Sequence, residues 1–154
     1  MAFLDDLHAF AAAHGLTVKG KALAHEFVLE GGTTERRVTM AQGSILAPRG
    51  GGKLFHFRLT FEPWAIEPSW LLTPQGATRW DAAAPSPVRP EDVPGFSRFG
   101  APLAEFGAEV KTHWQLKLGE QNRLYLEALA LVSARAWALA WQVLEAAWAG
   151  SATG

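Results

Sequence analysis

Alternation of apolar and polar side chains predicts five strands in this chain. In the clearest stretch, residues 53–62, the apolar residues Phe55, Phe57, Leu59 and Phe61 alternate with polar ones. A period of two is typical of a strand with one buried face and one exposed face. The same pattern, or a weaker form of it, covers residues 23–30, 36–41, 110–118 and 124–127. Gly31-Gly32 and residues 119–122 are predicted to be turns.

Two further stretches follow a helical period. Residues 2–14 place Phe3, Leu7 and Phe10 on one face, and Gly15 is predicted to end this helix. A second helix is predicted from an N-cap at Ser133 to a C-terminal Gly150. Its stripe at positions i, i+4, i+7 and i+11 consists of Trp137, Trp141, Leu144 and Trp148.

The closing helix is apolar over most of its circumference. Between residues 133 and 149 the only strongly polar side chains are Arg135, Gln142 and Glu145. A helix of this kind must be covered on more than one side. We expect the sheet to provide one cover and a second subunit to provide the other. The stripe Trp137, Trp141, Leu144 and Trp148 is therefore the predicted dimer or partner interface.

The middle of the chain breaks both patterns. Residues 63–102 hold eight of the nine prolines, together with Trp64, Trp70 and Trp80. Because proline interrupts regular elements, this segment is predicted to be an irregular insertion, with a short strand or a turn of helix at residues 69–73 and a short helix near residues 102–107. The expected fold is α+β: one domain over residues 1–154, with an antiparallel sheet of about five strands and helices at both ends.

Composition narrows the classes of function. The chain has no cysteine, and none of its five histidines forms a closely spaced pair, so no metal or cofactor is expected. The formal net charge is −1, whereas dedicated nucleic-acid binders usually carry a basic excess. The sequence shows neither a signal peptide nor an apolar run long enough to span a membrane. We therefore expect a cytoplasmic protein with no role at a membrane.

No catalytic motif emerges. Residues 49–53 resemble a phosphate loop, but Ala47 replaces the first glycine and Leu54 follows Lys53. Ser97 lies in a stretch one residue too long for a nucleophile elbow. The acidic residues of the middle segment, Glu62, Glu67 and Asp81, are expected to be scattered surface acids. The sequence predicts a protein that is not an enzyme.

The expected element order resembles that of the type III secretion chaperones and their relatives, the YbjN-like proteins. Three stretches carry the resemblance: the opening helix ending at Gly15, the phenylalanine-rich strand at 55–61, and the hairpin at 116–126. The family pattern is a helix, three strands, a helix, two strands and a closing helix. The resemblance implies a non-enzymatic homodimer that grips extended segments of protein partners on apolar patches. The long middle segment departs from the family.

Two functions follow from these observations. The first is a dimeric binding module, chaperone-like or adaptor, that recruits protein partners. The alternative is a DNA-associated accessory protein with a basic surface on the dimer, whose phosphate contacts would be salt-sensitive. Its candidate residues are Arg36, Arg37, Lys53, Arg58, Lys111 and Lys117. The near-neutral net charge favours a different interpretation of these residues, a solvated sheet face that Glu26, Glu35 and Glu62 balance.

Overall fold

The computed structural model describes residues 2–22, 25–46, 53–81, 84–111 and 113–151. Its elements in chain order are α1 (Ala2–His14), β1 (Leu16–Val18), β2 (Phe27–Gly32), β3 (Arg37–Leu46), β4 (Lys53–Glu62), β5 (Ser69–Thr73), β6 (Gly76–Asp81), β7 (Ala84–Val88), η2 (Pro90–Asp92), α2 (Phe96–Val110), β8 (Trp114–Leu118), η3 (Glu120–Asn122), β9 (Leu124–Ala128) and α3 (Ala134–Ser151). The predicted α+β class with an antiparallel sheet is confirmed.

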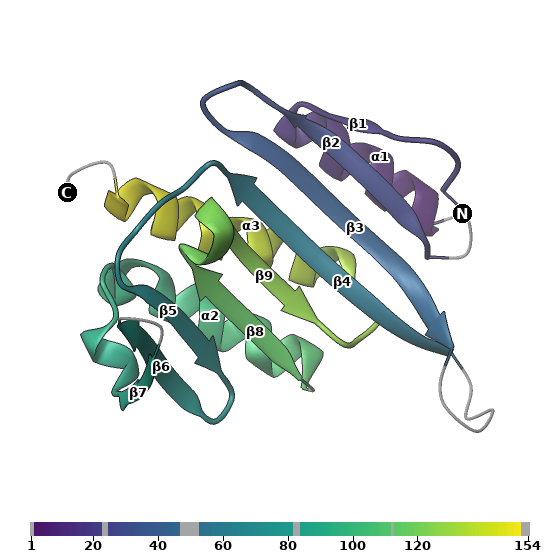
Figure 1. Cartoon of the computed structure of the whole chain (residues 1–154). Coiled ribbons are helices and arrows are strands. Elements are labelled where there is room, and N and C mark those ends of the chain that lie inside the picture. Colours follow the sequence, from purple (N-terminus) through teal and green to yellow (C-terminus); the bar gives the residue numbers. More distant parts are fainter. Residues whose placement is uncertain (1, 23–24, 47–52, 82–83, 112, 152–154) are drawn as a thin grey trace.

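The described strands form one sheet in the order β1-β2-β3-β4-β9-β8-β5-β6-β7. This sheet has nine strands, so the prediction of about five was too low. The three helices lie behind it in Figure 1 and cover one face, which leaves the opposite face without helices. We call this uncovered side the open face. In the described part of the chain, no helix combines the length and the apolar character needed to cross a bilayer.

The register of the strands explains why the core forms on the face of the sheet that the helices cover. Antiparallel pairing aligns a row of buried residues across neighbouring strands, in the order Leu29, Met40, Leu59, Leu126, Leu116 and Leu72. Each of these side chains has an exposed fraction of 2% or less. Side chains alternate along a strand, so the residues between them must point to the open face. The alternation seen in residues 53–62 therefore predicted the buried face of β4 correctly.

α3 lies between other parts of the same chain. It packs against α1 and α2 as well as β4 and β9. Trp137 and Leu144 are 2% and 0% exposed, so these two side chains are core residues and not surface for a partner. Trp141 and Trp148 remain partly exposed. α3 is apolar over most of its circumference because α1 and α2 cover it in addition to the sheet. The spacing of apolar residues within α3 could not show which segments cover it.

Three of the additional strands lie in residues 63–102, the segment predicted to be irregular. β5 has the bounds of the short strand that was one alternative for residues 69–73, whereas β6 and β7 were not predicted. β5 and β6 form a hairpin that pairs with β8, and β7 adds the outer strand. Pro85 and Pro87 lie in β7, which has a partner on one side only. Proline is tolerated at such an edge because one row of N–H groups needs no partner strand. Two of the eight prolines of this segment therefore lie in a strand at a position where a sheet tolerates them.

Some predicted boundaries were wrong. The strand predicted from residue 110 begins at Trp114, because α2 continues to Val110. Gly31-Gly32 is paired within β2, and the turn follows it at residues 33–36. The predicted N-cap at Ser133 is confirmed, since its Oγ accepts the backbone N–H of Ala136 at 3.3 Å. The first part of the strand predicted at 23–30 includes residues 23 and 24, which lie outside the described residues.

Both outer strands of the sheet are poor templates for another strand. β1 is three residues long, and β7 contains two prolines. Short edges and edge prolines are the usual defences against strand-to-strand association. If β1 and the β5–β7 meander are set aside, the remaining order is helix, three strands, helix, two strands, helix. The resemblance to secretion chaperones stays a prediction, because the sheet has four strands beyond the family pattern.

Candidate functional site

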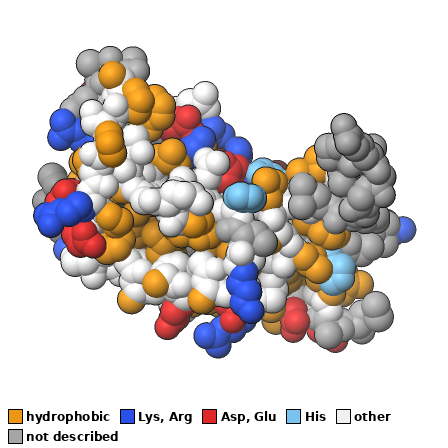
Figure 2. Space-filling view, turned by 90° about the horizontal axis from the view of Figure 1, so that it is seen from below, with side chains coloured by type: hydrophobic (Ala, Val, Ile, Leu, Met, Phe, Trp, Pro, Cys, Tyr) orange, Lys and Arg blue, Asp and Glu red, His pale blue; other side chains and the backbone are white. Residues whose placement is uncertain are grey.

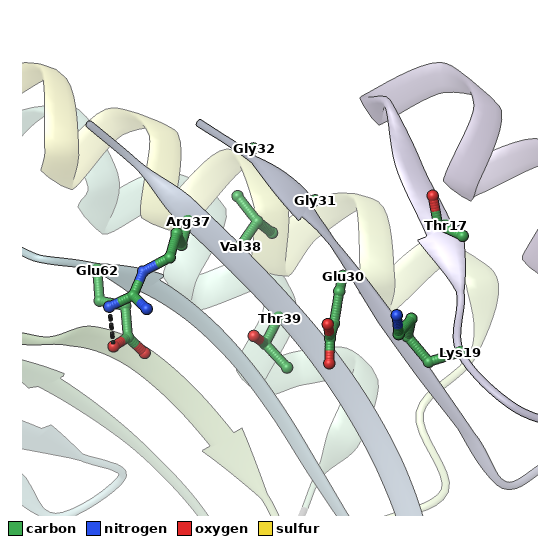
Figure 3. Close-up of a pocket in the computed structure, with 9 residues that line it drawn as sticks. All are labelled: Thr17, Lys19, Glu30, Gly31, Gly32, Arg37, Val38, Thr39 and Glu62. Carbon is green, nitrogen blue, oxygen red and sulfur yellow. Dashed lines mark hydrogen bonds and ion pairs between the residues drawn. The ribbon is translucent and has the colours of Figure 1, made fainter. Parts of the chain in front are cut away.

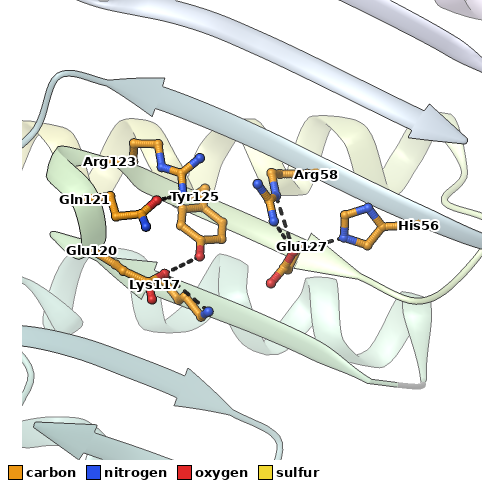
Figure 4. Close-up of polar contacts among 8 residues, drawn as sticks. All are labelled: His56, Arg58, Lys117, Glu120, Gln121, Arg123, Tyr125 and Glu127. Carbon is orange, nitrogen blue, oxygen red and sulfur yellow. Dashed lines mark hydrogen bonds and ion pairs between the residues drawn. The ribbon is translucent and has the colours of Figure 1, made fainter. Parts of the chain in front are cut away.

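A polar network occupies the middle of the open face (Figure 4). Glu127 of β9 accepts hydrogen bonds from His56 at 2.9 Å and from Arg58 at 2.9 Å, both on β4. The hydroxyl of Tyr125 donates to Glu120, which also forms an ion pair with Lys117 at 3.2 Å. The network joins β4, β8 and β9.

The ring of Tyr125 is only 2% exposed although it lies on the open face. The side chains of Arg58, Lys117 and Arg123 cover it, with their cationic groups 4.6, 5.5 and 5.0 Å from the ring centroid. Cations attracted to the face of an aromatic ring stabilise such an arrangement. The aromatic ring is therefore sealed from solvent by charged side chains.

The network shifts the pKa values of its acids in opposite directions. Burial alone would raise the pKa of Glu127, but the hydrogen bonds from His56 and Arg58 outweigh it and lower this pKa. The hydrogen bond from Tyr125 is the main cause that lowers the pKa of Glu120. Burial, followed by the bond to Glu120, raises the pKa of Tyr125. At neutral pH both carboxylates are thus held ionised and the phenol is held neutral.

A second site on the open face lies toward the β1 edge of the sheet. It is a shallow hollow of about 520 Å³ over β1, β2 and β3 (Figure 3). Lys19, Glu30 and Glu62 line it, and Arg37 bonds Glu62 at 3.1 Å. Charges of both signs alternate around this hollow, so it favours neither anions nor cations. Among the described residues, no group of three or more His, Asp or Glu side chains is arranged to hold a metal ion.

The six candidate nucleic-acid contacts do not form one basic surface. Arg37, Arg58 and Lys117 share the open face, and each forms an ion pair, with Glu62, Glu127 and Glu120 respectively. Arg36 points to the helical side and pairs with Glu145 of α3. Lys111 is the C-cap residue of α2 and belongs to no strand. The side chain of Lys53 lies outside the described residues.

Arg36 packs beside the two exposed tryptophans of the predicted interface. Its guanidinium lies 5.8 Å from the ring of Trp141 and 5.7 Å from that of Trp148. Trp141 also stacks on His14 of α1, with ring centroids 4.0 Å apart. Burial, partly offset by the charge of Glu145, lowers the pKa of His14. Much of the surface of Trp141 and Trp148 is therefore covered by the chain itself.

A hollow of about 200 Å³ opens between α2 and the lower ends of β5 and β8, and we call it the α2 hollow. Its lining is almost wholly apolar and includes Leu72, Pro90, Phe96, Leu103, Ala104 and Trp114. Figure 2 views the molecule from this end and shows hydrophobic side chains gathered there. The α2 hollow is the clearest exposed apolar concavity in the described part of the chain.

Small residues on α2 create the α2 hollow. Gly100, Ala104 and Gly107 follow the helical spacing i, i+4 and i+7 and all line it. A side-chain carbon at Gly100 would lie 2.9 Å from the ring of Phe96, and one at Gly107 would lie 3.0 Å from Trp114 Nε1. The two glycines therefore allow both aromatic rings to lie against the helix. This spacing was visible in the sequence, but the helix that carries it was predicted too short.

Comparison of the chain with protein-family models, with curated proteins and with solved structures finds no match.

Proposed function

We propose that this protein is a non-enzymatic binding module, chaperone-like or adaptor, that holds an apolar segment of a protein partner in the α2 hollow. The observation that carries the proposal is the hollow itself, with Phe96, Leu103 and Trp114 in its wall. Exposed apolar concavities of this kind are typical of surfaces that bind other proteins. The element order, which agrees with the secretion-chaperone resemblance, supports the same function.

The sealed polar network supports a non-catalytic reading of the open face. A general acid or base must reach the substrate through an accessible proton-transfer atom. The Tyr125 hydroxyl is already bonded to Glu120, and Glu127 is bonded by both His56 and Arg58. These groups satisfy one another and stabilise the sheet.

Site-specific cross-linking tests the proposal. A photoreactive amino acid replaces Ala104, which is exposed in the α2 hollow, or Ala138, an exposed alanine of α3 outside it. We expect one protein to be cross-linked from position 104 and not from position 138. The variant Ala104→Glu, which places a charge in an apolar hollow, should lose that protein in copurification. Equal labelling from both positions, or a partner retained by Ala104→Glu, would contradict the proposal.

The nucleic-acid alternative has less support because Arg37, Arg58 and Lys117, the candidate contacts that share the open face, are paired with carboxylates. Binding to phosphates requires unpaired cations that release counterions. A gel shift with single-stranded and linear duplex DNA at two salt concentrations separates the alternatives. Salt-sensitive binding that is unchanged in Ala104→Glu would favour the nucleic-acid function.

A further inference from the structure

A trough runs past Trp80 on the open face and shares no lining residue with the α2 hollow. Trp80 of β6 is 40% exposed. By size, it is the largest of the exposed hydrophobic side chains in the described part of the chain. Two adjoining hollows of about 370 and 620 Å³ share Ser69, Trp80 and Glu120 in their lining. Volumes of this order are typical of small-molecule sites. We call the two together the Trp80 trough.

One wall of the Trp80 trough is a tightly held turn. Gln121 has a φ of 54°, in the left-handed region that most residues other than glycine seldom adopt, and Asn122, a residue type that tolerates this region better, has a φ of 60°. The carbonyl of Asn122 accepts the backbone N–H of Trp64 at 2.8 Å, which ties the turn to the loop before β5. At Gly119, a side-chain carbon would lie 2.6 Å from Ile66. Strained residues of this kind persist only where the surroundings fix them, and they concentrate at binding sites.

The polar lining selects against charged ligands. Lys117 is the only basic side chain that lines the trough, and it is paired with Glu120 at 3.2 Å. Glu67 adds a second carboxylate, which would repel an anion. At the other end, the paired charges of Lys117 and Glu120 compensate each other, so that end favours neither sign of charge. The ligand that fits best is therefore neutral.

The same lining offers hydrogen-bond donors and acceptors around an aromatic ring. The hydroxyl of Ser69 and the amides of Gln115, Gln121 and Asn122 can each donate and accept. Gln121 uses its Oε1 to accept from Arg123, which leaves its amide N–H groups for a ligand. A neutral ligand with one apolar face and many hydroxyl groups satisfies both features.

We propose that the Trp80 trough binds a neutral carbohydrate. The C–H face of a pyranose ring would pack on the indole of Trp80, and its hydroxyl groups would bond the amides and carboxylates around it. The inference concerns binding and not hydrolysis. Of the two carboxylates that line the trough, Glu120 is already bonded by Tyr125 and paired with Lys117, which leaves Glu67 alone. Glu62 lies at the opposite hollow with Arg37, and the side chain of Asp81 lies outside the described residues. Carbohydrate binding in the Trp80 trough does not depend on the protein partner proposed for the α2 hollow.

Ligand-detected NMR on the full chain tests this inference. The probes are neutral hexasaccharides of glucose, in α-1,4 and β-1,4 linkage, and of N-acetylglucosamine. We expect saturation transfer from the protein to at least one of them, and binding weaker by on the order of tenfold or more in Trp80→Ala. Trp80→Tyr should keep part of the affinity because a ring remains.

Two further variants separate a binding role from a folding role. Asn122→Gly keeps a backbone that suits the left-handed φ and removes one amide, so it should fold normally and bind more weakly. Leu131→Ala changes an exposed apolar residue elsewhere and should bind as the natural chain does. Absence of transfer to all three sugars would overturn the proposal. Affinity unchanged in Trp80→Ala, or preference for a nucleoside or choline over the sugars, would also overturn it.

Discussion

At the scale of residues, the main finding is that Arg37, Arg58 and Lys117 on the open face each pair with a carboxylate. Glu127 bonds His56 and Arg58, which lie 71 and 69 positions earlier in the chain. Gln42 provides a second example, on the core side. Its amide donates to the carbonyl of His25 at 2.8 Å and accepts from the N–H of Val132 at 3.0 Å. Buried polar groups need such partners, and separation in the sequence conceals them.

The Glu127 pairing predicts a dependence of stability on pH. Its folded-state pKa is lowered, so its stabilising contribution is present above the ordinary glutamate pKa of about 4.3 and is lost as the pH falls through the lowered value. Glu127→Gln should reduce the free energy of unfolding by about 1–3 kcal/mol at pH 7. The difference from the natural chain should shrink below about pH 4.

Urea unfolding at a series of pH values provides the measurement. Glu105→Gln, on an exposed position of α2, is the matched control and should change stability little at any pH. A loss in Glu127→Gln that stays the same from pH 7 to pH 3 would show that the ionised form of Glu127 does not supply the stabilisation.

At the scale of elements, two adjacent arginines have different roles. Arg36 precedes β3 and lies over the ring of Phe61, 4.5 Å from its centroid, where it pairs with Glu145 of α3. Arg37 begins β3 and faces the open side. Neighbouring positions of a strand point to opposite faces, so a pair of basic residues in the sequence cannot serve a single surface there.

Substitution of each arginine by alanine should separate these roles. Arg36→Ala should lower the free energy of unfolding by about 1–2 kcal/mol, because a cation packed on aromatic rings is lost. Arg37→Ala should cost less than about 1 kcal/mol, because its side chain is 65% exposed and its ion pair is solvated. Denaturant unfolding of both variants is the measurement. Equal losses would mean that Arg36 does not tie α3 to the sheet.

The hydrophobic pattern predicted an element correctly where that element buries a single face against one neighbouring layer. α1 and β4 have the bounds that the sequence predicts, Ala2–His14 and Lys53–Glu62. α2 was shortened in the prediction because Pro102 was placed in its first turn. In the structure Pro102 lies inside the helix, which begins at Phe96. The buried series Phe99, Leu103, Phe106 and Val110 was available in the sequence as a helical period.

At the scale of the whole molecule, assembly remains a prediction. The argument for a dimer came from the breadth of the apolar face on α3, and the chain itself covers Trp137 and Leu144. The outer strands β1 and β7 are unsuited to pairing. Among the described surfaces, the α2 hollow is the best remaining candidate for contact with a second copy.

Light scattering on the natural chain and on Ala104→Glu measures the assembly. The dimer prediction requires twice the mass of one chain. If the mass falls to that of a monomer in Ala104→Glu and not in Ala138→Glu, the second copy occupies the α2 hollow. A monomeric natural chain would contradict the dimer prediction and leave the hollow free for a different protein.

The sequence by itself determined the helices at both ends, the buried faces of β4, β8 and β9, and the α+β class. These features depend on the spacing of apolar residues, which is local. Tertiary structure decided that β5 pairs with β8, that α3 is covered by two helices, and which charges are neutralised on the open face. The period of a pattern shows that a face is buried, but it does not show which distant segment buries it. That choice depends on contacts between residues far apart in the chain, such as Glu127 with Arg58.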